Sequence, residues 1–166
     1  MHGSRRYCIT IRWPGRRDRC SMRYLSQRFT APNRVCMAVL TDVATEELGH
    51  LEMVSTIVHQ LTANLTVEEI EKQGFADYYV DHAVGIWPQS AGGIPFNSCE
   101  FQSKGDPITD MFESMAAEQK ARSTYDNILR VVRDIPEIAD PIRFLRAREV
   151  VHFQRFGEAS SLYRIS

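Results

Sequence analysis

Apolar residues recur every three or four positions along three long stretches of the chain, which is the spacing of one buried face of an α-helix. These stretches run from just after Asn33 to about Leu65, from Asp106 to Val132, and from Asp140 to Ala159. A shorter amphipathic stretch covers about Met22 to Phe29. The pattern therefore predicts four principal helices and an all-α fold.

Capping residues predict where several of these helices begin. Asp106-Pro107 and Asp140-Pro141 each combine an N-cap side chain with a proline suited to the first helical position. Thr66 and Glu69 have the spacing of a capping box, which predicts a short extra helix ending at Gly74.

Residues 75–105 show no sustained period and contain the Gly-, Pro- and Ser-rich segment PQSAGGIPFNS. We interpret them as a long crossover loop, with room for short strands. Four helices with a long connection between the second and the third predict a ferritin-like four-helix bundle.

Polar residues interrupt the apolar face of each long helix. Glu47 and His50 lie in the first stretch, Glu118 in the second, and Glu149 and His152 in the third. In each of the two Glu-x-x-His pairs, ELGH and EVVH, the three-residue spacing places both side chains on one face of a helix. Several buried carboxylates in one core are costly unless they bind cations, and two divalent ions resolve this charge problem. Carboxylate and imidazole ligands suit Mn or Fe.

The alternative interpretation is structural. A single Glu-x-x-His pair is most often a salt link or a core histidine, whereas two pairs and a third interior Glu favour a dinuclear site. We interpret Glu46 and Glu52 as solvated or ion-paired, and His59 and His82 as surface or loop residues, because neither histidine has a partner at ligand spacing.

Length, composition and charge narrow the possible classes of protein. A chain of 166 residues can form one domain with a sizeable core. We expect no membrane partner, because no apolar run reaches 18 residues, and the four cysteines lack zinc or disulfide spacing. Residues 1–23 carry seven arginines and one acidic residue, although the whole chain has a net charge of −1. We interpret this basic arm as an atypical terminus and expect no nucleic-acid partner.

Three segments resemble the manganese catalase family, and most closely its spore-coat branch: LTDVATEELGHLEMVSTIVHQL, QSKGDPITDMFESMAAEQKARSTY and DPIRFLRAREVVHFQRFGEA. The resemblance covers about Met22 to Ala159, and residues 22–166 would form the ferritin-like manganese catalase domain. It implies two Mn ions per subunit, with Fe as the alternative, and dismutation of hydrogen peroxide to water and oxygen. It also implies a homo-hexamer or a spore-coat assembly, located in the cytoplasm or in the spore coat.

The resemblance also implies residue roles. Glu149 would be a carboxylate beside the metals that handles protons, and Tyr24 would form a hydrogen bond near the cluster. The metal ligands would be Glu47, His50, Glu118 and His152.

One family ligand is missing. The family has a further Glu on its first helix, and counting back from Met22-Arg23-Tyr24-Leu25 places it at position 17, where this chain has Arg17. A guanidinium cannot bind a cation. A one-nucleotide shift in the codons for residues 11–21 can restore Glu at position 17 in register with Met22. We therefore hypothesise that residues 1–21 are translated out of frame.

The leading functional hypothesis is thus a dimanganese catalase, impaired by the loss of this ligand. The alternatives are a structural spore-coat protein with little or no turnover and a di-iron oxidase on the same bundle.

Overall fold

The computed structural model describes residues 17–73 and 96–164, and it confirms the predicted all-α, ferritin-like bundle. Within these residues there is no strand. The four principal helices are α2 (Arg17–Gln27), α3 (Arg34–Thr62), α5 (Pro107–Val132) and α6 (Pro136–Ser161). The shorter elements are α4 (Val67–Lys72) and the 3₁₀ turns η2 (Arg28–Thr30), η4 (Ser98–Phe101) and η5 (Leu162–Arg164).

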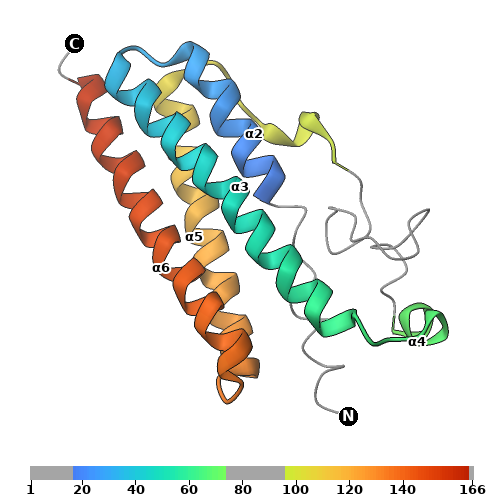
Figure 1. Cartoon of the computed structure of the whole chain (residues 1–166). Coiled ribbons are helices and arrows are strands. Elements are labelled where there is room, and N and C mark those ends of the chain that lie inside the picture. Colours follow the sequence, from blue (N-terminus) through green and yellow to red (C-terminus); the bar gives the residue numbers. More distant parts are fainter. Residues whose placement is uncertain (1–16, 74–95, 165–166) are drawn as a thin grey trace.

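The bundle consists of two helical hairpins (Figure 1). Helices α2 and α3 form the first hairpin through η2, and α5 and α6 form the second through a short turn. Helices α3 and α5 run in the same direction, so the connection between them joins opposite ends of the bundle (Figure 1). Most of this predicted crossover, residues 74–95, lies outside the described residues.

Two of the predicted caps are present, those of α4 and α5, and a further side-chain cap begins α3. The side chain of Asn33 accepts a hydrogen bond from the Cys36 backbone N–H at 2.9 Å and begins α3. Asp106 accepts a hydrogen bond from the Thr109 N–H at 2.8 Å, with proline in the next position, as the sequence predicts. The capping box that begins α4 is also formed by both of its predicted residues. The predicted end at Gly74 lies outside the described residues.

The first and last helices begin earlier than predicted. Helix α2 begins at Arg17 rather than Met22, and Cys20 and Ser21 extend its buried face. Helix α6 begins at Pro136 rather than at Pro141, so the predicted N-cap Asp140 is wrong.

Asp140 is instead an exposed residue inside α6, and its carboxylate pairs with Arg143 at 2.5 Å. The earlier start places Ile138 and Ala139 in the core, which favours helix there despite the proline that follows.

Two apolar clusters fill the interior, one toward each end of the bundle. The first packs Leu40, Val43 and Ala44 of α3 against α2, α5 and α6. The second packs Val54, Ile57 and Val58 of α3 against α5 and α6. The α3 residues between these clusters include the buried polar side chains, so the polar centre lies between two dry layers.

Candidate metal centre

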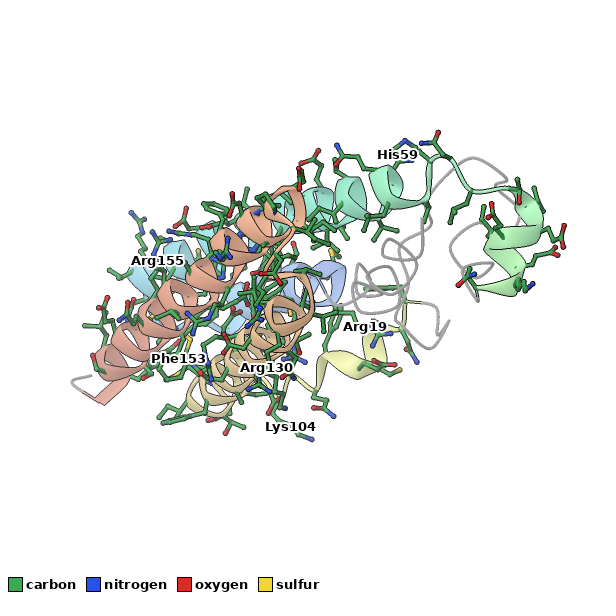
Figure 2. The ribbon with its side chains drawn as sticks, turned by 90° about the horizontal axis from the view of Figure 1, so that it is seen from below. Arg19, His59, Lys104, Arg130, Phe153 and Arg155 are labelled. Atoms are coloured by element: carbon green, nitrogen blue, oxygen red, sulfur yellow. The ribbon has the colours of Figure 1, made fainter. Side chains whose placement is uncertain are left out.

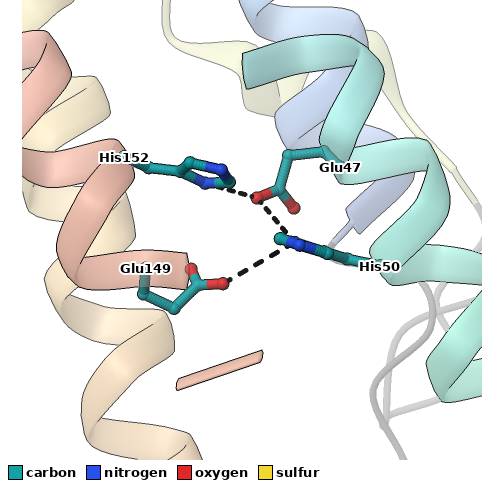
Figure 3. A group of neighbouring side chains, drawn as sticks. All are labelled: Glu47, His50, Glu149 and His152. Carbon is teal, nitrogen blue, oxygen red and sulfur yellow. Dashed lines mark hydrogen bonds and ion pairs between the residues drawn. The ribbon is translucent and has the colours of Figure 1, made fainter. Parts of the chain in front are cut away.

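Five ionisable side chains that the sequence singled out come together between the two apolar clusters. They project from three helices, and each side chain is at most 2% exposed; they are Glu47 and His50 of α3, Glu118 of α5, and Glu149 and His152 of α6. Figure 3 shows the four from α3 and α6 pointing toward one another.

The helical register explains the convergence. Three residues separate Glu from His in each pair, so both side chains of a pair leave the helix on one face. Because α3 and α6 pack against each other, the two pairs meet. The Glu47 carboxylate lies between the rings, with its Oε1 atom 3.2 Å from Nδ1 of His50 and 3.0 Å from Nδ1 of His152.

Two further carboxylates, one from α5 and one from α6, lie beside the same histidines. Oε2 of Glu118 lies 3.4 Å from Nδ1 of His152, and Oε1 of Glu149 lies 3.9 Å from Nδ1 of His50. The rings of His50 and His152 are stacked, with centroids 5.4 Å apart and planes inclined by 21°. The centre is therefore a compact set of oxygen and nitrogen donors.

These donors fit a divalent cation. Glu47, His50, Glu149 and His152 each offer one ligand atom, and these atoms all lie within 4.8 Å of one another. Among the described residues, Nδ1 of His152 and Oε2 of Glu118 are buried without a hydrogen-bond partner. Buried polar atoms normally have partners, so atoms left without one point to a ligand of another kind.

The electrostatics of the centre also indicate a missing positive charge. Burial disfavours the charged form of His152, but the carboxylates of Glu118 and Glu47 outweigh burial and raise the pKa of His152 to about 10. In the metal-free chain this imidazole therefore holds a proton at neutral pH. A metal cation supplies the same compensation, and its binding to a ring nitrogen displaces a proton.

Tyr24 contacts this centre from α2, as predicted. Its hydroxyl donates a hydrogen bond to Oε1 of Glu118, and its ring packs edge-on against Phe156 with centroids 4.9 Å apart. Burial, and after it the charge of Glu118, raise the pKa of Tyr24 well above its ordinary value. The phenol therefore remains a hydrogen-bond donor across the working range of pH.

Glu46 is a neighbour of the centre that the sequence analysis did not place there. Its predicted ion pairing is confirmed, because Arg148 donates to both of its oxygens. The same carboxylate also lies within 3.5 Å of Nε2 of His50 and 3.2 Å of Nε2 of His152. Burial opposes the ionisation of Glu46, but Arg148 and then His152 outweigh it and lower the pKa of Glu46 to about 2.

The remaining predicted positions lie elsewhere. Glu52 and His59 are exposed on α3, and His59 lies near the end of that helix, away from α5 and α6 (Figure 2). His82 and the side chain of Arg17 lie outside the described residues. None of the described helices combines the length and the apolar character needed to span a membrane.

The fold and the site together define a class: helical bundles with a buried carboxylate–histidine centre. The family of manganese containing catalases matches residues 19–163, and the chain belongs to this family. Protein CotJC of Bacillus subtilis (strain 168) is 44% identical over 144 residues, which cover 87% of this chain and 75% of CotJC. A probable manganese catalase of Clostridium acetobutylicum is 28% identical, over 85% of this chain and 62% of its own length.

A solved structure has the same fold. The chain superimposes on KatB, a manganese catalase from Anabaena, with a TM-score of 0.80 and 23% sequence identity. The match covers 97% of this chain and 73% of KatB. The chain thus spans about three quarters of KatB and CotJC, and 62% of the probable manganese catalase from Clostridium acetobutylicum.

Proposed function

We propose that the chain holds two manganese ions and dismutates hydrogen peroxide to water and oxygen. The observation that carries this proposal is the convergence of two Glu-x-x-His pairs and Glu118 in a dry core, in a member of the manganese catalase family. Glu47, His50, Glu118 and His152 are the proposed ligands. Iron is the alternative metal, because these donor types accept both.

The protein side of the chemistry follows from the positions of the side chains. Manganese supplies Lewis acidity and a redox couple between its divalent and trivalent states. Oxidation of one peroxide molecule to oxygen releases two protons, and reduction of a second molecule to water consumes two. The Glu149 carboxylate, buried among the donors, would carry these protons one at a time between the two half-reactions. Tyr24 holds Glu118 in position through its hydroxyl. The two apolar clusters exclude bulk water from both sides.

A structural role in the spore coat is the second candidate. Two observations favour it: the 44% identity to CotJC, and Arg17 at the position where the resemblance expects a ligand. In this case the bundle assembles with coat partners or with further copies of itself, and turnover is weak or absent. A cytoplasmic homo-hexamer is the arrangement proposed for an active catalase.

The test combines metal content with oxygen evolution. Purified chain, loaded with Mn²⁺ and desalted, is measured by plasma mass spectrometry and then mixed with peroxide at an oxygen electrode. We expect bound manganese and evolved oxygen, and we expect His152→Ala and Glu118→Ala to lose the metal. His59→Ala is the matched control, because this histidine is exposed. Metal well below one ion per chain, with no oxygen evolved, would instead support the structural role.

A further inference from the structure

We propose that Glu46, held by Arg148, is a positioning residue shared by both histidines of the centre. In this arrangement Glu46 accepts the Nε2–H of His50 and of His152, and the Nδ1 atom of each ring is left for metal. The inference rests on the proposed metal site and adds which nitrogen of each histidine ring binds the metal.

The two sides of each imidazole face different carboxylates. Both Nδ1 atoms face Oε1 of Glu47, at 3.2 and 3.0 Å. On the opposite side, Oε1 of Glu46 lies 3.5 Å from Nε2 of His50, and its Oε2 lies 3.2 Å from Nε2 of His152. One carboxylate therefore lies beside both rings, with one oxygen toward each Nε2 atom, although neither contact has hydrogen-bond geometry in the metal-free chain.

A neutral imidazole has one N–H and one lone pair, so the partner of one nitrogen fixes the role of the other. A carboxylate beside Nε2 favours the tautomer with its proton there, and the lone pair is then on Nδ1. Carboxylates that hold the free N–H of a metal-binding histidine orient the ring and make it a stronger ligand. Glu46 is in the place for this role on both rings.

Arg148 identifies Glu46 as the holding residue rather than a ligand. Its guanidinium donates from Nε to Oε1 and from Nη2 to Oε2, the latter at 3.0 Å, in a bidentate pair that fixes the carboxylate plane. The side chain of Glu46 is 28% exposed, whereas that of Glu47 is fully buried. The arginine-bound carboxylate thus forms the outer wall, and Glu47 faces the donors.

The sequence repeats this arrangement in the two helices. Glu46 directly precedes the Glu-x-x-His pair of α3, and Arg148 directly precedes the pair of α6. The residue just before each Glu-x-x-His pair is therefore charged, negative in α3 and positive in α6. Arg148 and Glu46 form their ion pair where the two Glu-x-x-His pairs come together. The packing of α3 on α6 is thereby coupled to the orientation of both histidine rings.

The first test measures metal affinity. Glu46→Gln keeps the shape of the side chain but removes its charge and its bidentate pairing with arginine. We expect dissociation constants for Mn²⁺ and for Zn²⁺, measured by chelator competition, to rise by about 10- to 100-fold with the number of bound ions unchanged. Glu52→Gln is the matched control on the same helix, because Glu52 is exposed and bonds only Thr56 among the contacts seen. Its affinity should equal that of the wild type.

The second test reads the ring nitrogens directly. Long-range ¹H–¹⁵N spectra of the Zn²⁺-loaded chain should show both histidines protonated at Nε2 and metal-bound at Nδ1. Arg148→Lys keeps the positive charge but cannot form the bidentate pair with Glu46. It should therefore weaken the affinity for metal by less than Glu46→Gln does. It also provides a second variant if Glu46→Gln folds poorly by circular dichroism.

The outcomes separate this inference from the proposed catalase activity. Both tests measure metal binding and not turnover, and Zn²⁺ does not change oxidation state. They can therefore be carried out even if the chain evolves no oxygen. Unchanged affinity in Glu46→Gln, or metal bound at Nε2, would overturn the positioning role even in an active enzyme. Loss of a whole ion in Glu46→Gln would make Glu46 a ligand and overturn it as well. So would a wild-type chain that binds neither metal.

Discussion

Glu118 and Glu149 are both buried carboxylates, but their neighbours differ. Glu118 accepts a hydrogen bond from Tyr24 and lies 3.4 Å from His152, so its position is fixed by a donor on another helix. Glu149 lies one turn before His152 on α6 and 3.9 Å from Nδ1 of His50. We therefore expect the first to serve metal binding and the second to serve proton transfer.

Glu149→Gln separates these roles. The amide has the shape of the carboxylate but cannot exchange a proton at neutral pH, so manganese content should persist while oxygen evolution falls by about 100-fold or more. The measurements are metal content and initial rate on the same sample. Glu158→Gln, on an exposed position of α6, should change neither. If Glu149→Gln lost the metal, Glu149 would have to be counted among the ligands.

Tyr24→Phe tests the hydroxyl that holds Glu118. The substitution leaves a buried carboxylate oxygen without its donor, so the metal-free chain should lose about 1–3 kcal/mol of unfolding free energy. Urea denaturation in the presence of a chelator measures this loss. Manganese content should stay close to that of the wild type, because the phenol is not a proposed ligand. An unchanged unfolding midpoint would mean that this hydrogen bond contributes nothing net.

At the scale of elements, the entry into α5 depends on a buried aspartate. Asp110 is 3% exposed, and its carboxylate accepts hydrogen bonds from the backbone N–H groups of Lys104 at 2.7 Å and Gly105 at 3.0 Å. Gly105 has a φ of +76°, a conformation that suits glycine. The aspartate therefore fixes the turn that follows the crossover and sets where α5 starts.

Asp110→Ala should lower the unfolding free energy by about 1–3 kcal/mol, because two backbone donors lose a charged partner. Asp140→Ala is the matched control on α6. Asp140 is exposed and pairs only at the surface with Arg143, so we expect a change within about 0.5 kcal/mol. A large loss in Asp140→Ala would restore it as a cap, against the structure.

The sequence predicts the elements better than their starts. Periodicity identifies the long helices because their buried faces are continuous, and Asp106 is a true cap because its side chain accepts the N–H of Thr109, the third residue of the helix. Asp140-Pro141 has the same letters, but the apolar face continues before it through Ile138 and Ala139. Burial of that face determines the start, and local capping signals do not include it.

The candidate site is also only partly readable from the chain. Glu47, His50, Glu118, Glu149 and His152 interrupt apolar faces, so periodicity identifies them all. Glu46 does not interrupt such a face, and its proximity to the histidines arises from packing of α3 on α6. One sequence signal could have indicated this contact: Glu46 and Arg148 carry opposite charges, and each directly precedes a Glu-x-x-His pair.

At the scale of the whole molecule, a substitution in the first helix is expected to restore metal binding and activity. α2 begins at Arg17, seven residues or about two turns before Tyr24, so both positions share one helical face. We propose that residues 1–21 replace an in-frame segment that carried Glu at position 17.

Arg17→Glu should therefore tighten manganese binding, so that more of the metal is retained per chain after desalting, and should raise the rate of oxygen evolution. Arg17→Gln is the matched control, because it removes the cation without adding a carboxylate. Resequencing the start of the gene tests the origin of the segment. If Arg17→Glu and Arg17→Gln bind equal amounts of metal, position 17 supplies no ligand.

The two hairpins each contribute one Glu-x-x-His pair, and α5 adds the remaining carboxylate. Neither hairpin alone contains a complete donor set. An ion at the centre is therefore bound by both hairpins at once, and they cannot separate while it stays. Separation of the hairpins therefore requires that the ion first leaves, so the loaded chain should unfold more slowly than the metal-free chain.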